Sequence, residues 1–73
     1  MQQLDGVVTI VQESRFQLLD DDGVSHQFVL GYGAAVEPEQ LPLLLERRIR
    51  VAYADPKDLI GHRADRLLLL DGA

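Results

Sequence analysis

The segment from Arg15 to Leu30 predicts a β-hairpin with an acidic turn, and it constrains the fold more than any other stretch of the chain. A two-residue loop at Asp22-Gly23 would suit a type I′ turn, but it would mix apolar and polar residues on one face. A three-residue loop with Gly23 in the left-handed conformation instead pairs Phe16 with Phe28. Because a slip of one residue turns every side chain to the other face, we predict this second register.

In this register the two faces of the hairpin differ in polarity. The inward face is expected to carry Phe16, Leu18, Val24, Phe28 and Leu30. The outward face carries Arg15, Gln17, Ser25 and Gln27, with Leu19 and Val29 as apolar exceptions. His26 falls on the inward face near the tip, where we expect a half-buried, hydrogen-bonded imidazole. The aromatic rings of the hairpin are therefore predicted to lie in the core.

The length of 73 residues predicts a single domain, residues 1–73, with a small core. The absence of cysteine excludes disulfides and thiolate metal sites. The N-terminal segment has neither the basic region nor the long apolar run of a signal peptide or membrane span. We therefore expect a cytoplasmic protein that does not associate with membranes.

Three further strands and one helix are predicted outside the hairpin. The strands are expected at 4–13, 48–54 and 63–71. The first is apolar on both faces, which indicates either a strand buried on two sides or one that bends and serves two sheets. Residues 37–46 predict a short helix, a 3₁₀ turn leading into an α-turn, that places Leu41, Leu44 and Leu45 in the core. Residues 55–60 predict a single helical turn, and residues 31–35 predict a flexible connector.

This order of elements resembles that of the OB-fold, a five-stranded Greek-key barrel with a short helix between its third and fourth strands. The residues that carry the resemblance are Gly6-x-Val8, Phe16-x-Leu18-x-Asp20 with Gly23, and Ile49-x-Val51-x-Tyr53. The resemblance implies a mainly β, OB-like barrel that binds ligands on the outer face of strands two and three. An SH3-like barrel is the alternative, since that fold has its helical turn before the last strand; the longer helical signal at Pro38 favours the OB-like arrangement.

Charge and residue types limit the functions that such a barrel could have. The net charge of −5 disfavours nucleic-acid binding, which depends on neutralising phosphates. Single-strand binding also needs exposed aromatic rings, and the hairpin register turns Phe16 and Phe28 inward. Six of the seven cations nevertheless lie between Arg47 and Arg66. The candidate binding surface therefore comprises Arg48, Arg50, Arg63, Arg66, Arg15 and Lys57.

The remaining motifs do not predict catalysis, a metal or a cofactor. A calcium loop at the acidic turn fails, because Leu18 and Val29 would occupy positions that need oxygen ligands. His26 and His62 lack ligand spacing, and His62 is expected to be exposed in a loop. Gly31-x-Gly33 lacks the context of a phosphate loop, and no nucleophile elbow occurs. We therefore expect no enzyme activity.

The sequence thus predicts a non-catalytic binding or protein-interaction module. Exposed aliphatic side chains on Leu19, Val29 and one face of the last strand would suit a protein partner or a homodimer. Contact between the basic segment and the acidic turn of another copy is a second route to self-association. The alternative is single-stranded nucleic-acid binding through the arginines of strands four and five.

Overall fold

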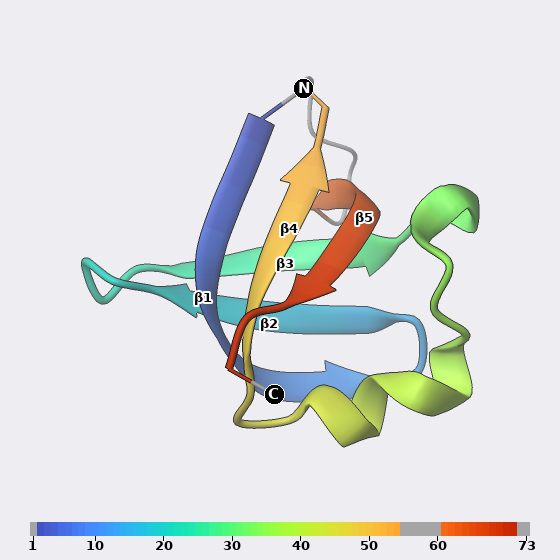
Figure 1. The fold of residues 1–73 in the computed structure, drawn as a ribbon, viewed down its shortest axis with the longest axis horizontal. Coiled ribbons are helices and arrows are strands. Elements are labelled where there is room, and N and C mark those ends of the chain that lie inside the picture. The colour runs from blue at the N-terminus through green and yellow to red at the C-terminus, as the bar shows by residue number, and fades with distance from the viewer. Residues whose placement is uncertain (1, 55–60, 72–73) are drawn as a thin grey trace.

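Five strands close into one barrel, in the order β1-β2-β3-β5-β4, in the computed structural model, which describes residues 2–54 and 61–71. The elements are β1 (Gln2–Gln12), β2 (Arg15–Asp20), β3 (Ser25–Leu30), the 3₁₀ helices η1 (Tyr32–Ala34) and η2 (Pro38–Leu44), β4 (Arg48–Tyr53) and β5 (His62–Leu69). Neighbouring strands are antiparallel except β3 and β5, which are parallel (Figure 1). The predicted mainly β, five-stranded barrel with a short helix between its third and fourth strands is confirmed, and each strand begins and ends within two residues of its predicted bounds.

The first strand bends and takes part in two pairings, which is one of the two arrangements that its apolar faces indicated. Residues 2–7 pair with β4, and residues 6–12 pair with β2. The register shifts between Val8 and Ile10, which is a β-bulge. Before the bulge Val8 faces the core and is 1% exposed, whereas Ile10 beyond it is 51% exposed. The bulge therefore explains why both faces of this strand carry apolar residues.

The hairpin adopts the predicted register. Phe16 pairs with Phe28, and Leu18 pairs with His26. Gly23 has a φ of 81°, the left-handed conformation that the three-residue loop requires. One expectation is wrong: Val24 was predicted to be buried, but it is 50% exposed, because the tip of the hairpin extends beyond the body of the barrel (Figure 1).

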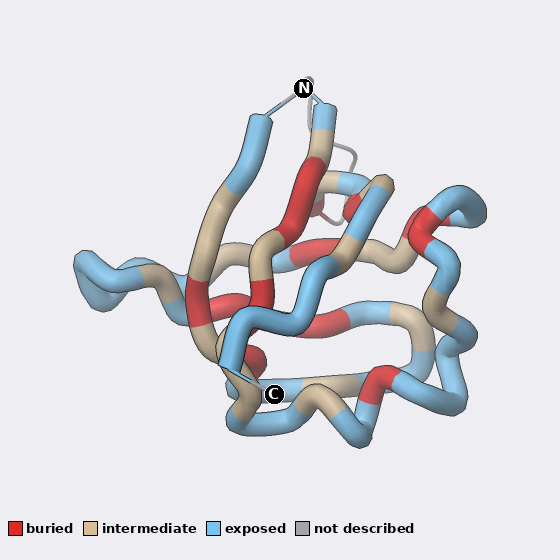
Figure 2. Tube along the Cα trace, viewed as in Figure 1, coloured by how far each residue is buried: buried red, intermediate tan, exposed pale blue. Residues whose placement is uncertain are grey.

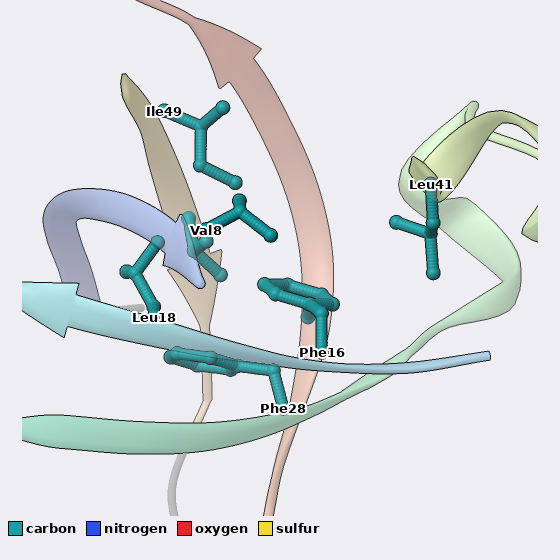
Figure 3. Close-up of a cluster of buried hydrophobic side chains, with 8 residues drawn as sticks. Val8, Phe16, Leu18, Phe28, Leu41 and Ile49 are labelled. Atoms are coloured by element: carbon teal, nitrogen blue, oxygen red, sulfur yellow. The ribbon is translucent and has the colours of Figure 1, made fainter. Parts of the chain in front are cut away.

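The core lies inside the barrel, where the buried parts of the strands face one another (Figure 2). The rings of Phe16 and Phe28 stack with their centroids 5.4 Å apart, and they form its centre (Figure 3). The buried residues of the cluster are Val8, Phe16, Leu18, Phe28, Leu41, Ile49, Val51 and Ala64. The aromatic rings are therefore used by the core, as the sequence predicted.

The connection from β3 to β4 differs from its prediction in three respects. The predicted flexible connector contains η1, and η2 remains a 3₁₀ helix with Pro42 inside it, where proline removes a backbone donor. Leu41 is buried and Leu44 is half-buried, as predicted, but Leu45 is 44% exposed because it follows the end of η2.

None of the helices in the described ranges is long and apolar enough to span a bilayer. The helical turn predicted at 55–60 lies outside the described residues.

Candidate binding surfaces

The outer face of β1 and β4 carries paired charges, and we call it the aspartate–arginine face (Asp5, Asp21, Arg48 and Arg50). Arg50 lies opposite Asp5 in the antiparallel register of these strands. Its Nε donates to Asp5 Oδ1 at 2.8 Å, and its Nη2 donates to Asp5 Oδ2 at 3.1 Å. Two parallel hydrogen bonds of this kind fix the geometry of the pair as well as its charge.

Arg48 forms a second bidentate pair with the acidic turn. Arg48 lies beside Val7 of β1, and Val7 lies beside Leu19 of β2, so its side chain reaches across β1 to the hairpin. The Nη1 and Nη2 groups of Arg48 donate to the two carboxylate oxygens of Asp21 at 2.8 and 2.9 Å. The basic strand and the acidic turn, which the sequence suggested as partners between two copies, thus pair within one chain.

Asp71 binds the arginines at the start of β4. Its Oδ1 accepts a hydrogen bond from Arg47 Nε at 3.1 Å, and its Oδ2 accepts one from the backbone N–H of Arg48 at 3.0 Å. Leu70 also donates its backbone N–H to the Arg48 carbonyl at 2.9 Å. Three of the chain's arginines, Arg47, Arg48 and Arg50, are therefore neutralised by aspartates.

The acidic turn is organised by one carboxylate. Asp20 Oδ1 accepts hydrogen bonds from the backbone N–H groups of Asp22 and Val24, both at 2.9 Å. Asp20 Oδ2 lies 2.7 Å from His26 Nε2, so the expected half-buried, hydrogen-bonded imidazole is confirmed. No group of three or more carboxylates and imidazoles that could hold a metal ion occurs among the described residues. The turn thus uses its carboxylates for local structure and for the pair with Arg48.

These contacts predict a loss of stability in acid. Hydrogen bonds from Arg50, His26 and Arg48 respectively hold the pKa values of Asp5, Asp20 and Asp21 below their ordinary value of 3.8. The Arg48 backbone N–H does the same for the pKa of Asp71.

Since a lowered pKa means weaker proton binding in the folded state, the stabilisation is complete above about pH 4 and is lost as the pH falls through the folded-state pKa values. Thermal melts should therefore give a melting temperature that falls below about pH 4. An Asp21→Asn variant should show a smaller fall, and an equal fall in both proteins would contradict the role of the Arg48 pair.

The outer face of β2 and β3 has a different character. Arg15 lies opposite Val29, and Val29 lies opposite Arg63 of β5, so two arginines flank one valine. Two residues further along both strands, Gln27 Nε2 donates to Gln17 Oε1 at 2.9 Å. This face therefore combines guanidinium groups with polar amides. The parallel pairing of β3 with β5 brings Arg15 and Arg63 to it from distant parts of the chain.

A hollow of about 540 Å³ lies at the end of this face, where β3 leads into η1. Tyr32 borders it with a ring that is entirely exposed to solvent. The rest of its wall combines aliphatic side chains with polar and charged ones, and it includes Val29, Leu30, Val36, Pro38, Glu37 and Arg63. The sequence did not indicate this hollow, because its residues come from the β1–β2 turn, β3, β5 and the connection between β3 and β4.

The end of β5 exposes three consecutive leucines, which we call the leucine patch (Leu68, Leu69 and Leu70). Their exposed fractions are 54%, 43% and 36%. β5 pairs with β3 only from His62 to Ala64, so beyond Ala64 the described strands pair with β5 on the β4 side alone. Figure 2 shows the exposed end of β5 on the surface of the barrel. Leu68 lies opposite Arg50, whereas Leu69 lies opposite the buried Ile49. Because side chains alternate along a strand, Leu68 and Leu70 form the outward side of the patch and Leu69 lies on its inward side.

The remaining residues singled out in the sequence are Arg66, Lys57 and His62. Arg66 is exposed and lies opposite Ala52 on β4, whereas Lys57 lies outside the described residues. The expectation that His62 is exposed in a loop is wrong. His62 begins β5 and is half-buried, and its ring centroid lies 4.5 Å from that of Tyr53, because β3–β5 pairing draws the residue against the core.

No protein-family model, no curated protein and no solved structure matches the chain at a significant level. The aspartate–arginine face, the hollow beside Tyr32 and the leucine patch are therefore the features from which a function can be inferred.

Proposed function

We propose that the chain is a non-catalytic, OB-like interaction module that binds a protein surface through the leucine patch, with a second copy of the chain as the first partner to test. The observation that carries this proposal is the exposure of Leu68, Leu69 and Leu70 on consecutive positions. A small domain has few apolar side chains to spare, and contiguous exposed ones mark interaction surfaces.

The edge of β5 strengthens the case for a protein partner. Beyond Ala64 this strand has a paired neighbour among the described strands only in β4. Its other side can accept backbone hydrogen bonds from an added strand, which is a common mode of protein recognition. Leucine side chains beside such an edge would supply apolar contact area. A strand from another protein, or from a second copy, fits both features.

Self-association can be measured by sedimentation velocity. We expect the mass to rise from 8.2 kDa towards that of a dimer as concentration increases. A variant with Leu68→Gln and Leu70→Gln should dimerise at least about ten-fold more weakly, because both side chains lose apolar contact. Leu43→Gln is the matched control, since Leu43 is 74% exposed but lies on η2, outside the patch. A monomer at all accessible concentrations would exclude the homodimer.

Single-stranded nucleic-acid binding is the competing function. Arg15 and Arg63 flank Val29 on the outer face of β2 and β3, which supports it. The ion pairs of Arg48 and Arg50 with aspartates count against a nucleic-acid site on β4. Titration of a labelled oligothymidylate at low salt separates the two functions, and our proposal expects no binding. Salt-sensitive binding that is lost in Arg15→Ala with Arg63→Ala, but retained in Arg48→Ala with Arg50→Ala, would favour nucleic acid.

A further inference from the structure

The hollow beside Tyr32 has features that the leucine patch does not explain. The backbone that carries Tyr32 is held in place: Gly31 donates its N–H to the Ala64 carbonyl at 2.9 Å, and Ala34 donates to the Gly31 carbonyl at 3.2 Å. Ala34 is buried, but the adjacent Tyr32 ring contributes no burial to the fold. An exposed aromatic ring on a hydrogen-bonded backbone offers a large contact area to a ligand.

The walls of the hollow favour an aliphatic group. Val29, Leu30 and Val36 form part of the lining together with Pro38, and these residues offer no aromatic surface other than that of Tyr32. The volume of about 540 Å³ lies within the usual range of ligand pockets. One aliphatic side chain with its flanking backbone would occupy this space. Stacked bases would need more than one ring.

The charges around the hollow favour carboxylates. Arg63 lines it, and its side-chain stem lies over Gly31, since a Cβ built there would be 3.0 Å from Arg63 Cγ. Arg15 lies on the other side of Val29. The nearby Glu37 would repel a run of phosphates more than one or two carboxylates.

We propose that this hollow is a second binding site, which takes a short acidic peptide segment. An aliphatic side chain of the peptide occupies the hollow against Tyr32, and its carboxylates pair with Arg63 and Arg15. The site consists of residues of β3, β5 and the β3–β4 connection, together with Arg15 of β2, and it uses no residue of the leucine patch. Binding here is therefore independent of self-association through β5.

The test is a titration followed by ¹⁵N–¹H correlation spectra of the full chain. The probe is an acetylated, amidated peptide with one leucine between two glutamates, and the control peptide has lysines in place of the glutamates. We expect saturable shifts at the amides of Val29, Gly31 and Tyr32 with the acidic probe alone. Tyr32→Ala should weaken binding about three- to ten-fold, as lost aromatic contact predicts, and should leave the rest of the spectrum unchanged because the ring is exposed.

Further variants separate this site from the leucine patch. Arg63→Gln should weaken binding of the acidic probe about two- to five-fold, the usual range for an exposed ion pair. Leu68→Gln with Leu70→Gln should leave it unchanged, whatever the oligomeric state of the protein. Absence of shifts at the three amides, or equal binding of the lysine peptide, would overturn the proposal. Shifts there with oligothymidylate and not with the acidic peptide would reassign the hollow to nucleic acid.

Discussion

Replacement of Phe28 by alanine should lower the free energy of unfolding by about 3–5 kcal/mol, the usual cost of removing a buried aromatic ring. The Phe28 side chain is 1% exposed, its ring stacks on Phe16, and its centroid lies 5.3 Å from that of Tyr53 in an edge-on contact. A domain of 73 residues has a total stability of roughly 4–11 kcal/mol. The loss of this one ring should therefore remove between about a quarter and all of this stability.

Urea denaturation followed by circular dichroism measures this effect directly. Val24→Ala provides the matched control, because Val24 lies in the same hairpin but is 50% exposed. Exposed substitutions usually change stability by no more than about 0.5 kcal/mol. A cost for Val24→Ala equal to that of Phe28→Ala would mean that the tip is packed against the barrel. A cost below about 1 kcal/mol for Phe28→Ala would mean that the ring does not lie in the core.

The hairpin register could be predicted because it depends on local information. The turn fixes which residues face one another, and only one register places Phe16 and Phe28 on the same side. The alternation of Ile49, Val51 and Tyr53 in β4 predicts its inward face for the same reason. Strand positions follow from such patterns because side chains alternate between the faces of a sheet.

The errors occur where a segment leaves the body of the barrel or joins it. Val24 and Leu45 continue apolar patterns past the points where the core ends, so the pattern alone could not show their exposure. His62 follows a glycine that suggests a loop, but parallel pairing with Phe28 places it in β5. These outcomes depend on where distant strands end, and the sequence near each residue does not contain that information.

The candidate sites were even less predictable than the core. Arg48 and Asp21 are 27 positions apart, and they meet because β1 lies between their strands in a specific register. Arg15 and Arg63 share a face only because β3 pairs with β5. The sequence indicates these arginines as candidates because they are cationic. Which of them pair with aspartates depends on the register between strands that are far apart in the sequence.

The pairing of β1 with β2 leaves no room for a side chain at Gly6. This residue is buried in β1, at the point where β1 pairs with both β2 and β4. A Cβ atom at Gly6 would lie 2.3 Å from the backbone oxygen of Leu19 and 3.0 Å from Leu18 Cγ. Because a backbone atom cannot move aside as a side chain can, Gly6→Ala must separate β1 from β2. We expect a cost of about 1–3 kcal/mol or more, as for other overpacked sites.

Gly33→Ala is the matched control for this substitution. A Cβ at Gly33, in η1, would come no closer than 3.9 Å to its nearest neighbour, the Asp65 carbonyl oxygen. With no clash, the alanine restricts the unfolded chain and should stabilise the protein by up to about 1 kcal/mol. Thermal melts should therefore shift in opposite directions, by about 4–8 °C for each kcal/mol. Equal melting temperatures for the two variants would show that β1 and β2 do not approach this closely at Gly6, and the overlap of the two β1 pairings would then be wrong.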